Sequence, residues 1–266
     1  MPLAVCATPI GNLDDITLRV LAELRNADVV LAEDTRHTRG LLERHGIKAR
    51  LLSYHEHNEA ARVAELVPRL EAGERIALVT DAGMPAVSDP GARLVQAALE
   101  AGVELTVLPG ASAVETALVR SGLAAGRYAF VGFLPRKAGE LEALWRETAS
   151  WTWPLVAFES PRRLPASLRS LASFDPAREV AVCRELTKRF EEIVRGAAAD
   201  VAARFAEPPK GEITVVLGPG SAVSDPAEAR AAVADLVEAG TPRRVAADVV
   251  ARLTGGSRNE LYRSSL

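Results

Sequence analysis

The sequence predicts an α/β protein: two α/β domains, the first built on a mainly parallel sheet, followed by a small helical module. Three observations lead to this prediction. The length of 266 residues suits two domains of about 100 to 150 residues each. Apolar residues make up 48% of the chain and charged residues 25%, which is typical of a globular protein with buried cores. Short apolar runs alternate with amphipathic segments in the first half, as in a parallel sheet covered by helices on both faces.

The elements of the first domain can be assigned in order. Residues 3–7 form an apolar run that indicates a buried strand opening into a tight loop. We expect the next helix to begin near Asp14 and Asp15, because a helix N-terminus favours negative charge. The remaining elements are a strand at 28–32, a helix ending at Gly46, a strand at 51–52, a helix at 58–70, a strand at 76–80, a helix ending near Glu100, a strand at 103–108 and a helix opened by residues 109–113.

The second half repeats the pattern more loosely. Its expected strands are 128–133, 155–158, 180–183 and 213–217, and its expected helices are 138–148, 161–172 and 197–206. A glycine and proline cluster at 218–221 ends this part, and two or three short helices follow. The expected domains are therefore 1–121, 122–221 and 222–266.

The composition excludes several classes of protein. A net charge of −3 excludes a uniformly basic nucleic-acid coat, although it is compatible with a local basic patch. Cys6 and Cys183 lie in apolar runs and are expected to be reduced core residues, not a disulfide or a zinc site. No run approaches about 18 uncharged apolar residues, and the N-terminus lacks the basic start of a signal peptide. We expect a cytoplasmic protein with no membrane segment and no metal.

Glycine and proline clusters follow the first, fourth and fifth predicted strands, at 9–12, 81–91 and 109–113. In open α/β sheets, ligands bind beyond the carboxyl ends of the strands, where helix N-termini present free N–H groups. Taken singly, each loop is explained as an ordinary strand-to-helix turn. The three together indicate a ligand site.

The loops also restrict the ligand. The sequence has no G-x-G-x-x-G after the first strand and no G-x-x-x-x-G-K-[ST], so a dinucleotide or a P-loop nucleotide is not supported. A ligand carboxylate is expected against the N–H groups near Ser112 and Ala113, with Asp81 or Asp89 binding an ammonium or a ribose hydroxyl. S-adenosyl-L-methionine (SAM) carries all of these groups, but composition and spacing alone do not select it.

Eight motifs resemble those of a known family. Four lie in the first domain: VCATPIGNLDDITLR (5–19), LAEDTRHT (31–38), VTDAGMPAVSDPG (79–91) and LPGASA (108–113). They are similar to the tetrapyrrole methylase superfamily, and more closely to its ribosomal RNA small subunit methyltransferase I branch, whose members 2'-O-methylate a cytidine. The resemblance continues in order through FVGFLPRK (130–137), FESPRRL (158–164), CRELTK (183–188) and GEITVV (211–216).

The resemblance implies a fold, a cofactor and partners. It implies SAM in the cleft between the two α/β domains, a homodimer, a helix-turn-helix-like module at 222–266, and 16S ribosomal RNA or the small ribosomal subunit as substrate. Carried onto this sequence, the SAM-binding residues are Pro9, Asp81, Met84, Ser112, Ala113, Phe158 or Glu159, and the stretch from Gly211 to Thr214.

Methyl transfer to a ribose hydroxyl requires alignment, a dry pocket and removal of the hydroxyl proton. A general base contributes about 10² to 10⁴ in rate. We expect Asp34 or His37 to handle the proton, and Arg36 and Arg162 to contact phosphate. The competing interpretation of Asp34 is a helix cap, which is the commoner role of such an aspartate.

Two other polar pairs have competing interpretations. His55 and His57 resemble half a metal site, but with only four histidines and no cysteine pair a solvated strand end is favoured. Arg162 and Arg163 stand at a predicted helix start, where the helix dipole disfavours cations. That mismatch favours a neighbouring anion.

Two alternative functions share the same loops. A methyltransferase of a small tetrapyrrole such as a precorrin would use the same SAM residues, and a non-catalytic ribosome-assembly factor would keep SAM as a structural ligand. The C-terminal module favours RNA, because a small-molecule enzyme has little need of helices rich in arginine. From Gly240 onward, the charged residues are Arg243, Arg244, Arg252, Arg258 and Arg263 against Asp248 and Glu260.

Overall fold

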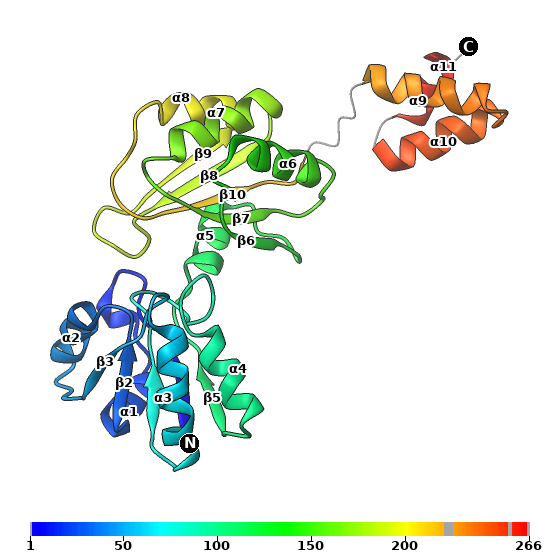
Figure 1. Cartoon of the computed structure of the whole chain (residues 1–266). Coiled ribbons are helices and arrows are strands. Elements are labelled where there is room, and N and C mark those ends of the chain that lie inside the picture. Colours follow the sequence, from blue (N-terminus) through cyan, green and yellow to red (C-terminus); the bar gives the residue numbers. More distant parts are fainter. Residues whose placement is uncertain (1, 221–225, 255–256, 265–266) are drawn as a thin grey trace. The chain divides into compact units, whose positions relative to one another are not determined.

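Two five-stranded sheets and a C-terminal group of helices make up the chain (Figure 1). The computed structural model describes residues 2–220, 226–254 and 257–264. The prediction of two α/β domains followed by short helices is confirmed.

The first sheet is parallel and has the strand order β3-β2-β4-β1-β5. Leu3 of β1 lies opposite Ile76 of β4 on one side and Leu105 of β5 on the other. The order places β4 and β1 side by side within the sheet. The strands are β1 (Leu3–Cys6), β2 (Val29–Ala32), β3 (Leu51–Ser53), β4 (Ile76–Leu78) and β5 (Leu105–Leu108).

Helices cover both faces of this sheet. Because strand side chains alternate, Leu3 and Leu78 pack in the core cluster that contains α3 and α4 residues, whereas Ala4 and Ala77 pack in the cluster with α1 and α2 residues. Each fully buried leucine contributes about 1.5 to 3 kcal/mol. The covering helices are α1 (Leu18–Asn26), α2 (Thr35–Arg44), α3 (Glu59–Glu71) and α4 (Ala92–Glu100), and α5 (Ala113–Ser121) follows the last strand of the sheet.

The expected start of the first helix near Asp14 is wrong. Residues 13–15 form a separate 3-10 turn, η1 (Leu13–Asp15), capped by the side chain of Asn12. Helix α1 begins three residues later, where the Thr17 side chain accepts a hydrogen bond from the Val20 N–H. The Thr17 cap accepts a hydrogen bond from a free backbone N–H of the helix, whereas Asp14 and Asp15 would offer only a favourable contact with the helix dipole. The helix therefore begins after the threonine.

The second sheet has the order β6-β7-β10-β8-β9. Strand β9 was not expected, because Glu192, Arg195 and Gly196 interrupt any apolar alternation, and Gly196 has a φ of 153°. An edge strand buries little and therefore has a weak sequence signal. The elements are β6 (Ala129–Phe133), α6 (Ala138–Thr148), β7 (Leu155–Glu159), α7 (Leu164–Phe174), β8 (Glu179–Arg184), β9 (Glu192–Ala197), α8 (Ala198–Arg204) and β10 (Ile213–Leu217).

Three C-terminal helices share a core of their own. Val233, Ala246 and Ala247 are fully buried within it. The boundary expected at residues 221 and 222 lies outside the described residues. In the ranges that the structure does describe, none of the helices has the length and apolar character to cross a membrane. The helices are α9 (Pro226–Glu238), α10 (Arg243–Thr254) and α11 (Arg258–Ser264).

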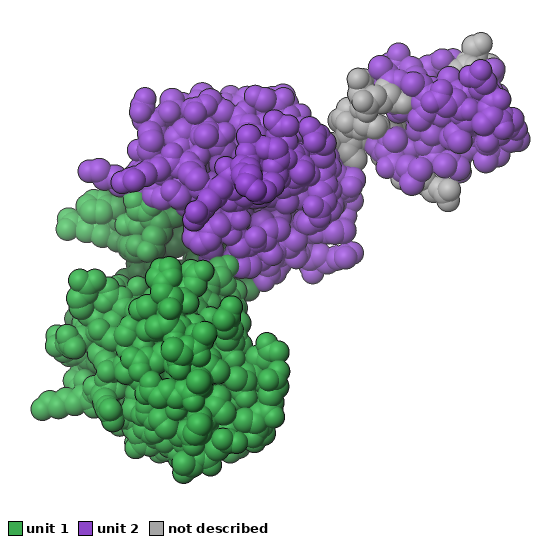
Figure 2. All heavy atoms as spheres, in the orientation of Figure 1, with its two compact units in different colours: residues 1–120, 183–193, 211–214 green, residues 121–182, 194–210, 215–266 purple. Residues whose placement is uncertain are grey.

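The chain divides into two compact units, and the division is not continuous in sequence (Figure 2). Unit 1 contains residues 1–120, 183–193 and 211–214, and the remaining residues belong to unit 2. The segment after β8 therefore packs with unit 1, although the residues before and after it in sequence belong to unit 2. The loops described next all lie in unit 1.

Candidate active site

The carboxyl edge of the first sheet has the topology of a ligand site. Strands β4 and β1 are neighbours, yet the chain leaves β1 toward β2 and leaves β4 toward β5, which lie on opposite sides. The connecting helices α1 and α4 consequently pack on opposite faces of the sheet. Open α/β sheets bind ligands at such a switch point, because the two loops diverge there.

A short antiparallel bridge joins the two diverging loops. The Thr8 N–H donates to the Gly83 carbonyl at 2.8 Å, and the Gly83 N–H donates to the Thr8 carbonyl at 3.1 Å. The buried Thr8 hydroxyl donates to the Thr80 carbonyl at 3.0 Å. Pro9, which is buried, and Met84, which is half-buried, flank the bridge. The structure thus brings these two expected SAM residues to one place.

The loop after β5 approaches the same point. A Cβ atom on Gly83 would lie 3.7 Å from Cγ2 of Ile10 and 4.0 Å from the carbonyl of Ala111, so three loops meet at this glycine. Gly110 is closer still, because a Cβ atom there would lie 2.9 Å from the Cβ of Ala7. A side chain at Gly110 would therefore push its loop away from Ala7, whereas at Gly83 the obstacle is the backbone, whose φ of 79° favours glycine.

Helix α5 begins directly after this loop, at Ala113. The Ser112 carbonyl accepts a hydrogen bond from the Thr116 N–H at 3.1 Å, and the Ser112 hydroxyl donates to the Glu115 carboxylate. The hydroxyl is therefore occupied by its own helix. What remains for a ligand carboxylate is the set of N–H groups in the first turn of α5.

Residues 183–193 complete this edge of unit 1. The Asn12 N–H donates to the Thr187 hydroxyl at 2.9 Å. A Cβ atom on Gly11 would lie 2.7 Å from that hydroxyl and 2.8 Å from the Leu186 carbonyl. The loop after β1 and this distant segment are therefore in van der Waals contact along their backbones.

Gly211 lies against the same segment. Its φ is 95°, and a Cβ atom there would lie 2.5 Å from the carboxyl group of Glu185. Glu185 accepts hydrogen bonds from the Glu212 N–H and from the Lys188 ammonium, both at 2.9 Å, and these partners lower the pKa of its carboxyl in that order. Thr214 follows as a buried residue of β10.

Backbone strain concentrates in two of these segments. Among the residues that the structure describes, the non-glycine residues with positive φ are Ala86 (68°), Ser88 (65°), Glu185 (53°) and Thr187 (64°). Such a conformation costs about 1 to 3 kcal/mol per residue and persists where surrounding contacts impose it, often at ligand sites. Both strained segments belong to the edge that the topology already marks.

Acidic side chains gather at the end of β4. The Thr80 hydroxyl donates to Glu33 at 2.9 Å, and Asp81 accepts the Asp34 N–H at 3.1 Å. Burial and, next, the charge of Glu33 raise the pKa of Asp89 from 3.8 to about 6. Carboxylates held close together in this way favour a cation or a hydroxyl donor in their midst.

The expected proton-handling residues begin α2. Asp34 caps this helix by accepting the Arg36 N–H at 2.8 Å, and it pairs with the Arg36 guanidinium, also at 2.8 Å. These bonds hold the pKa of Asp34 far below its usual range. Arg36 and His37 are exposed in the first turn. The cap role of Asp34 is therefore present in the structure, and the catalytic role of all three residues stays a prediction.

The other expected residues lie in unit 2. Phe158 and Glu159 end β7, and the buried Glu159 carboxylate accepts from the Ser167 hydroxyl at 2.5 Å and pairs with Arg163 at 2.5 Å. Its oxygens are thus occupied within its own unit. The sequence implied an anion close to the arginines at this helix start. For Arg163, that anion is the carboxylate of Glu159. Arg162 is exposed, and its contact with phosphate, like SAM binding by the two β7 residues, stays a prediction.

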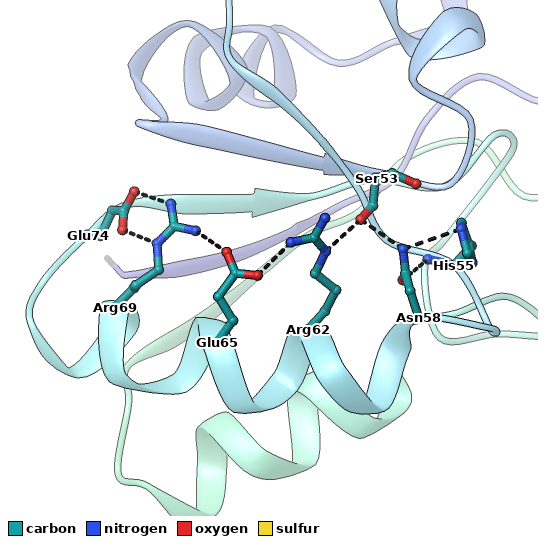
Figure 3. A network of polar contacts seen from close by, with 7 residues as sticks. All are labelled: Ser53, His55, Asn58, Arg62, Glu65, Arg69 and Glu74. Atoms are coloured by element: carbon teal, nitrogen blue, oxygen red, sulfur yellow. Dashed lines mark hydrogen bonds and ion pairs between the residues drawn. The ribbon is translucent and has the colours of Figure 1, made fainter.

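A polar network supports the loop after β3 (Figure 3). Asn58 accepts the His55 N–H at 2.9 Å and donates to the Ser53 carbonyl at 3.2 Å, and the Arg62 guanidinium donates to the same carbonyl. The network continues along α3 through Glu65, Arg69 and Glu74. In the described part of the chain, no group of three or more metal-ligating side chains is present.

One part of the site was missed by sequence reasoning. Residues 183–193 read as a strand end and loop of the second domain, but they pack against Gly11 and Asn12. Local periodicity cannot reveal a contact across about 175 residues. The signal that was available was the CRELTK motif at 183–188, which stands out from the apolar run before it.

Comparison with known proteins agrees with this geometry. A family model described as Tetrapyrrole (Corrin/Porphyrin) Methylases matches residues 2–202. The chain belongs to the tetrapyrrole methylase family. A family member from Mesorhizobium japonicum, named ribosomal RNA small subunit methyltransferase I, is 45% identical over 99% of this chain and 91% of its own length. The resemblance seen in the motifs is confirmed, including that to this branch.

Further relatives and solved structures extend the comparison. A protein of the same name from Thermotoga maritima is 43% identical, covering 81% of this chain and 97% of its own length. Uroporphyrin-III C-methyl transferase from Thermus thermophilus, solved with S-adenyl homocysteine, superposes with a TM-score of 0.58 at 20% identity, over 82% of this chain and 97% of that chain. The methyltransferase CobJ superposes at 0.63, with 20% identity, over 82% and 94%. These structural matches confirm the fold.

Proposed function

We propose that this protein is a SAM-dependent methyltransferase that 2'-O-methylates the ribose of a cytidine in 16S ribosomal RNA. The observation that carries the proposal is the 45% identity, over 99% of this chain, to a relative named ribosomal RNA small subunit methyltransferase I. Structures of tetrapyrrole methyltransferases are only 20 to 23% identical and bear on the fold alone.

The C-terminal module contributes less to this proposal than its arginines suggest. The Thermotoga maritima relative carries the same name although it matches only 81% of this chain. The match covers 97% of that relative's own length. We assign the C-terminal module a supporting role in RNA binding.

The residues at the carboxyl edge of unit 1 fit SAM. The N–H groups that open α5 suit its carboxylate, and the group around Asp81 and Asp89 suits its ammonium and ribose hydroxyls. The raised pKa of Asp89 fits a place prepared for positive charge, because a cation there would offset the repulsion from Glu33. When bound, SAM supplies the methyl group on a cationic sulfur.

The chain's own residues would position the substrate and accept its proton. Close packing at Gly11 and Gly110 leaves little room for water at the bases of these loops. A dry site favours the transfer, because the cationic sulfur of SAM becomes neutral as its methyl group leaves. Of the two proton acceptors proposed, His37 suits the task better, because the low pKa of Asp34 makes it a weak base at neutral pH. Arg36 is exposed beside it and would contact phosphate.

Labelled SAM tests the proposal directly. The protein is incubated with small ribosomal subunits, with naked 16S RNA or with a porphyrinoid. Label in RNA is the expected result, and mapping of 2'-O-methylated nucleotides in cells with and without the gene then locates the cytidine. Label in the pigment would favour a tetrapyrrole methyltransferase. SAM binding without transfer to any of them would favour a non-catalytic assembly factor.

The resemblance to the family supports two further proposals. We propose that the protein forms a homodimer and acts in the cytoplasm, where its substrate is assembled. Sedimentation at micromolar concentration tests the first, with a mass of two chains as the expected result. Fractionation of cells that express a tagged protein tests the second.

A further inference from the structure

The turn at 184–192, between β8 and β9, is held by ion pairs at both ends. Its charged residues other than Arg189 are paired within unit 1 or within the turn itself. These contacts hold the turn in a strained backbone conformation, which a loop without such contacts would not keep. The pairs are Arg184 with Glu192 at 3.0 Å, Lys188 with Glu185 and Glu212 at 2.9 Å, and Glu191 with Arg120 at 2.8 Å and with the Thr187 N–H at 2.8 Å.

Two residues project from this rigid base. Phe190 is 67% exposed, although an aromatic ring is normally among the more buried residues of a fold. The guanidinium of Arg189, itself exposed, lies 5.6 Å from the centre of the ring. An exposed ring with an adjacent cation is the combination with which proteins stack nucleobases and neutralise the neighbouring phosphates.

The turn also lies next to the candidate active site. Thr187, three residues before Phe190, is hydrogen-bonded to Asn12 in the loop that follows β1. We propose that Phe190 stacks on a base of the RNA substrate next to the nucleotide that is methylated, with Arg189 contacting the backbone. This inference rests on the proposed function, because it assumes that the substrate is RNA.

RNA explains these observations better than a protein partner. A protein interface of useful strength requires a contiguous buried patch, whereas the exposed apolar surface of this turn is a single ring among charged side chains. One ring suffices for one base, since stacking uses the face of the ring alone. The strain at Glu185 and Thr187 is then the cost of presenting the ring in a fixed direction.

Substitution of Phe190 tests the proposal in the full-length protein. Phe190→Ala is expected to raise KM for small ribosomal subunits by roughly 5- to 100-fold, as removal of one stacked base does. Phe190→Trp is expected to stay within about threefold of the wild type, because it keeps a stacking face. The matched control is Phe174→Ala, which removes a 40% exposed phenylalanine at the end of α7 in unit 2.

Two further measurements make the outcome specific. The Kd for SAM, measured by calorimetry, is expected to be the same in all variants. Arg189→Ala is expected to reduce the slope of log KM against log salt by about one, the loss of one phosphate contact. An unchanged KM for Phe190→Ala while the wild type methylates RNA would overturn the stacking role and leave the proposed function intact.

Other results would also overturn it. A change in sedimentation for Phe190→Ala would assign the ring to a contact between protein chains. Equal losses in Phe190→Ala and Phe190→Trp, with weaker SAM binding, would show a structural role for the residue. A wild-type protein that transfers no methyl group to RNA would refute the proposed function and this inference together.

Discussion

A methyl group added at Gly11 should disrupt the packing of the candidate site. A Cβ atom there would lie 2.6 Å from Cγ of Lys188, 2.7 Å from the Thr187 hydroxyl and 2.8 Å from the Leu186 carbonyl. The lysine side chain can move aside, but the carbonyl is backbone and the hydroxyl is fixed by its bond to Asn12. Gly11→Ala must therefore push residues 186–188 away from the loop.

The size of the effect follows from two losses. Overpacking of a close contact costs about 1 to 3 kcal/mol, and the hydrogen bond from the Asn12 N–H contributes about 0.5 to 1.5 kcal/mol. We expect Gly11→Ala to lower the free energy of unfolding by roughly 2 to 4 kcal/mol, with a shift of the urea midpoint at unchanged slope. Amide exchange at Asn12 is expected to accelerate, since its acceptor moves away.

A second glycine provides the control. Gly40 lies inside α2 and has nothing within 4 Å of an added Cβ atom. Gly40→Ala should therefore raise the free energy of unfolding by about 0.5 to 1 kcal/mol, the usual gain of alanine over glycine in a helix. Opposite signs for the two variants are the expected result. Wild-type stability and wild-type SAM affinity for Gly11→Ala would refute the close packing described here.

Three more predictions concern the charged groups and the proton acceptors. The folded-state pKa of Asp89 is raised from 3.8 to about 6, so its contribution to stability is present below pH 4 and lost as the pH rises through 6. Asp89→Asn should then stabilise the SAM-free protein at pH 8 by roughly 1 to 2 kcal/mol after solvent screening. Thermal unfolding at pH 4 and pH 8 measures this, and an equal gain in stability at the two pH values would contradict it. Glu159→Gln should lower the free energy of unfolding in urea by about 3 kcal/mol, because it leaves Arg163 without its partner. The double variant with Arg163→Gln should lose little more. If the losses of the two single variants add up in the double variant, the two residues do not act as a pair. His37→Ala is expected to lower the rate of methyl transfer to RNA about 100-fold, whereas Asp34→Asn should lose less because its role is to cap α2, and near-normal turnover in both would exclude them as proton acceptors.

The first sheet could be predicted in detail because its central strands, β1, β2 and β4, are apolar and buried, and its loops are rich in glycine and proline. Runs such as residues 3–7 and 28–32 have no other stable environment than a covered sheet. Strand β9 could not be predicted, since it pairs at an edge and carries Glu192, Arg195 and Gly196. Its pairing depends on β8, which no local pattern specifies.

The candidate site was predictable only where single loops define it. The loops at 9–12, 81–91 and 109–113 each follow a strand that the sequence predicts. In a parallel sheet these loops lie at the same edge, so their convergence could be predicted. The contact of Gly11 with Leu186 depends on long-range packing and had no local signal. Asp34 shows a different difficulty. An aspartate that caps a helix and an aspartate that accepts a proton look the same in the sequence, so the sequence alone cannot separate the two roles.

The return of residues 183–193 and 211–214 to unit 1 has a consequence for biosynthesis. A nascent chain that has emerged only as far as residue 120 possesses all five strands of the first sheet but lacks the partner for Gly11 and Asn12. The edge proposed to bind SAM is therefore complete only after residue 214 has left the exit tunnel. An enzyme proposed to modify ribosomes is thus kept incomplete for most of the time that a ribosome spends making it.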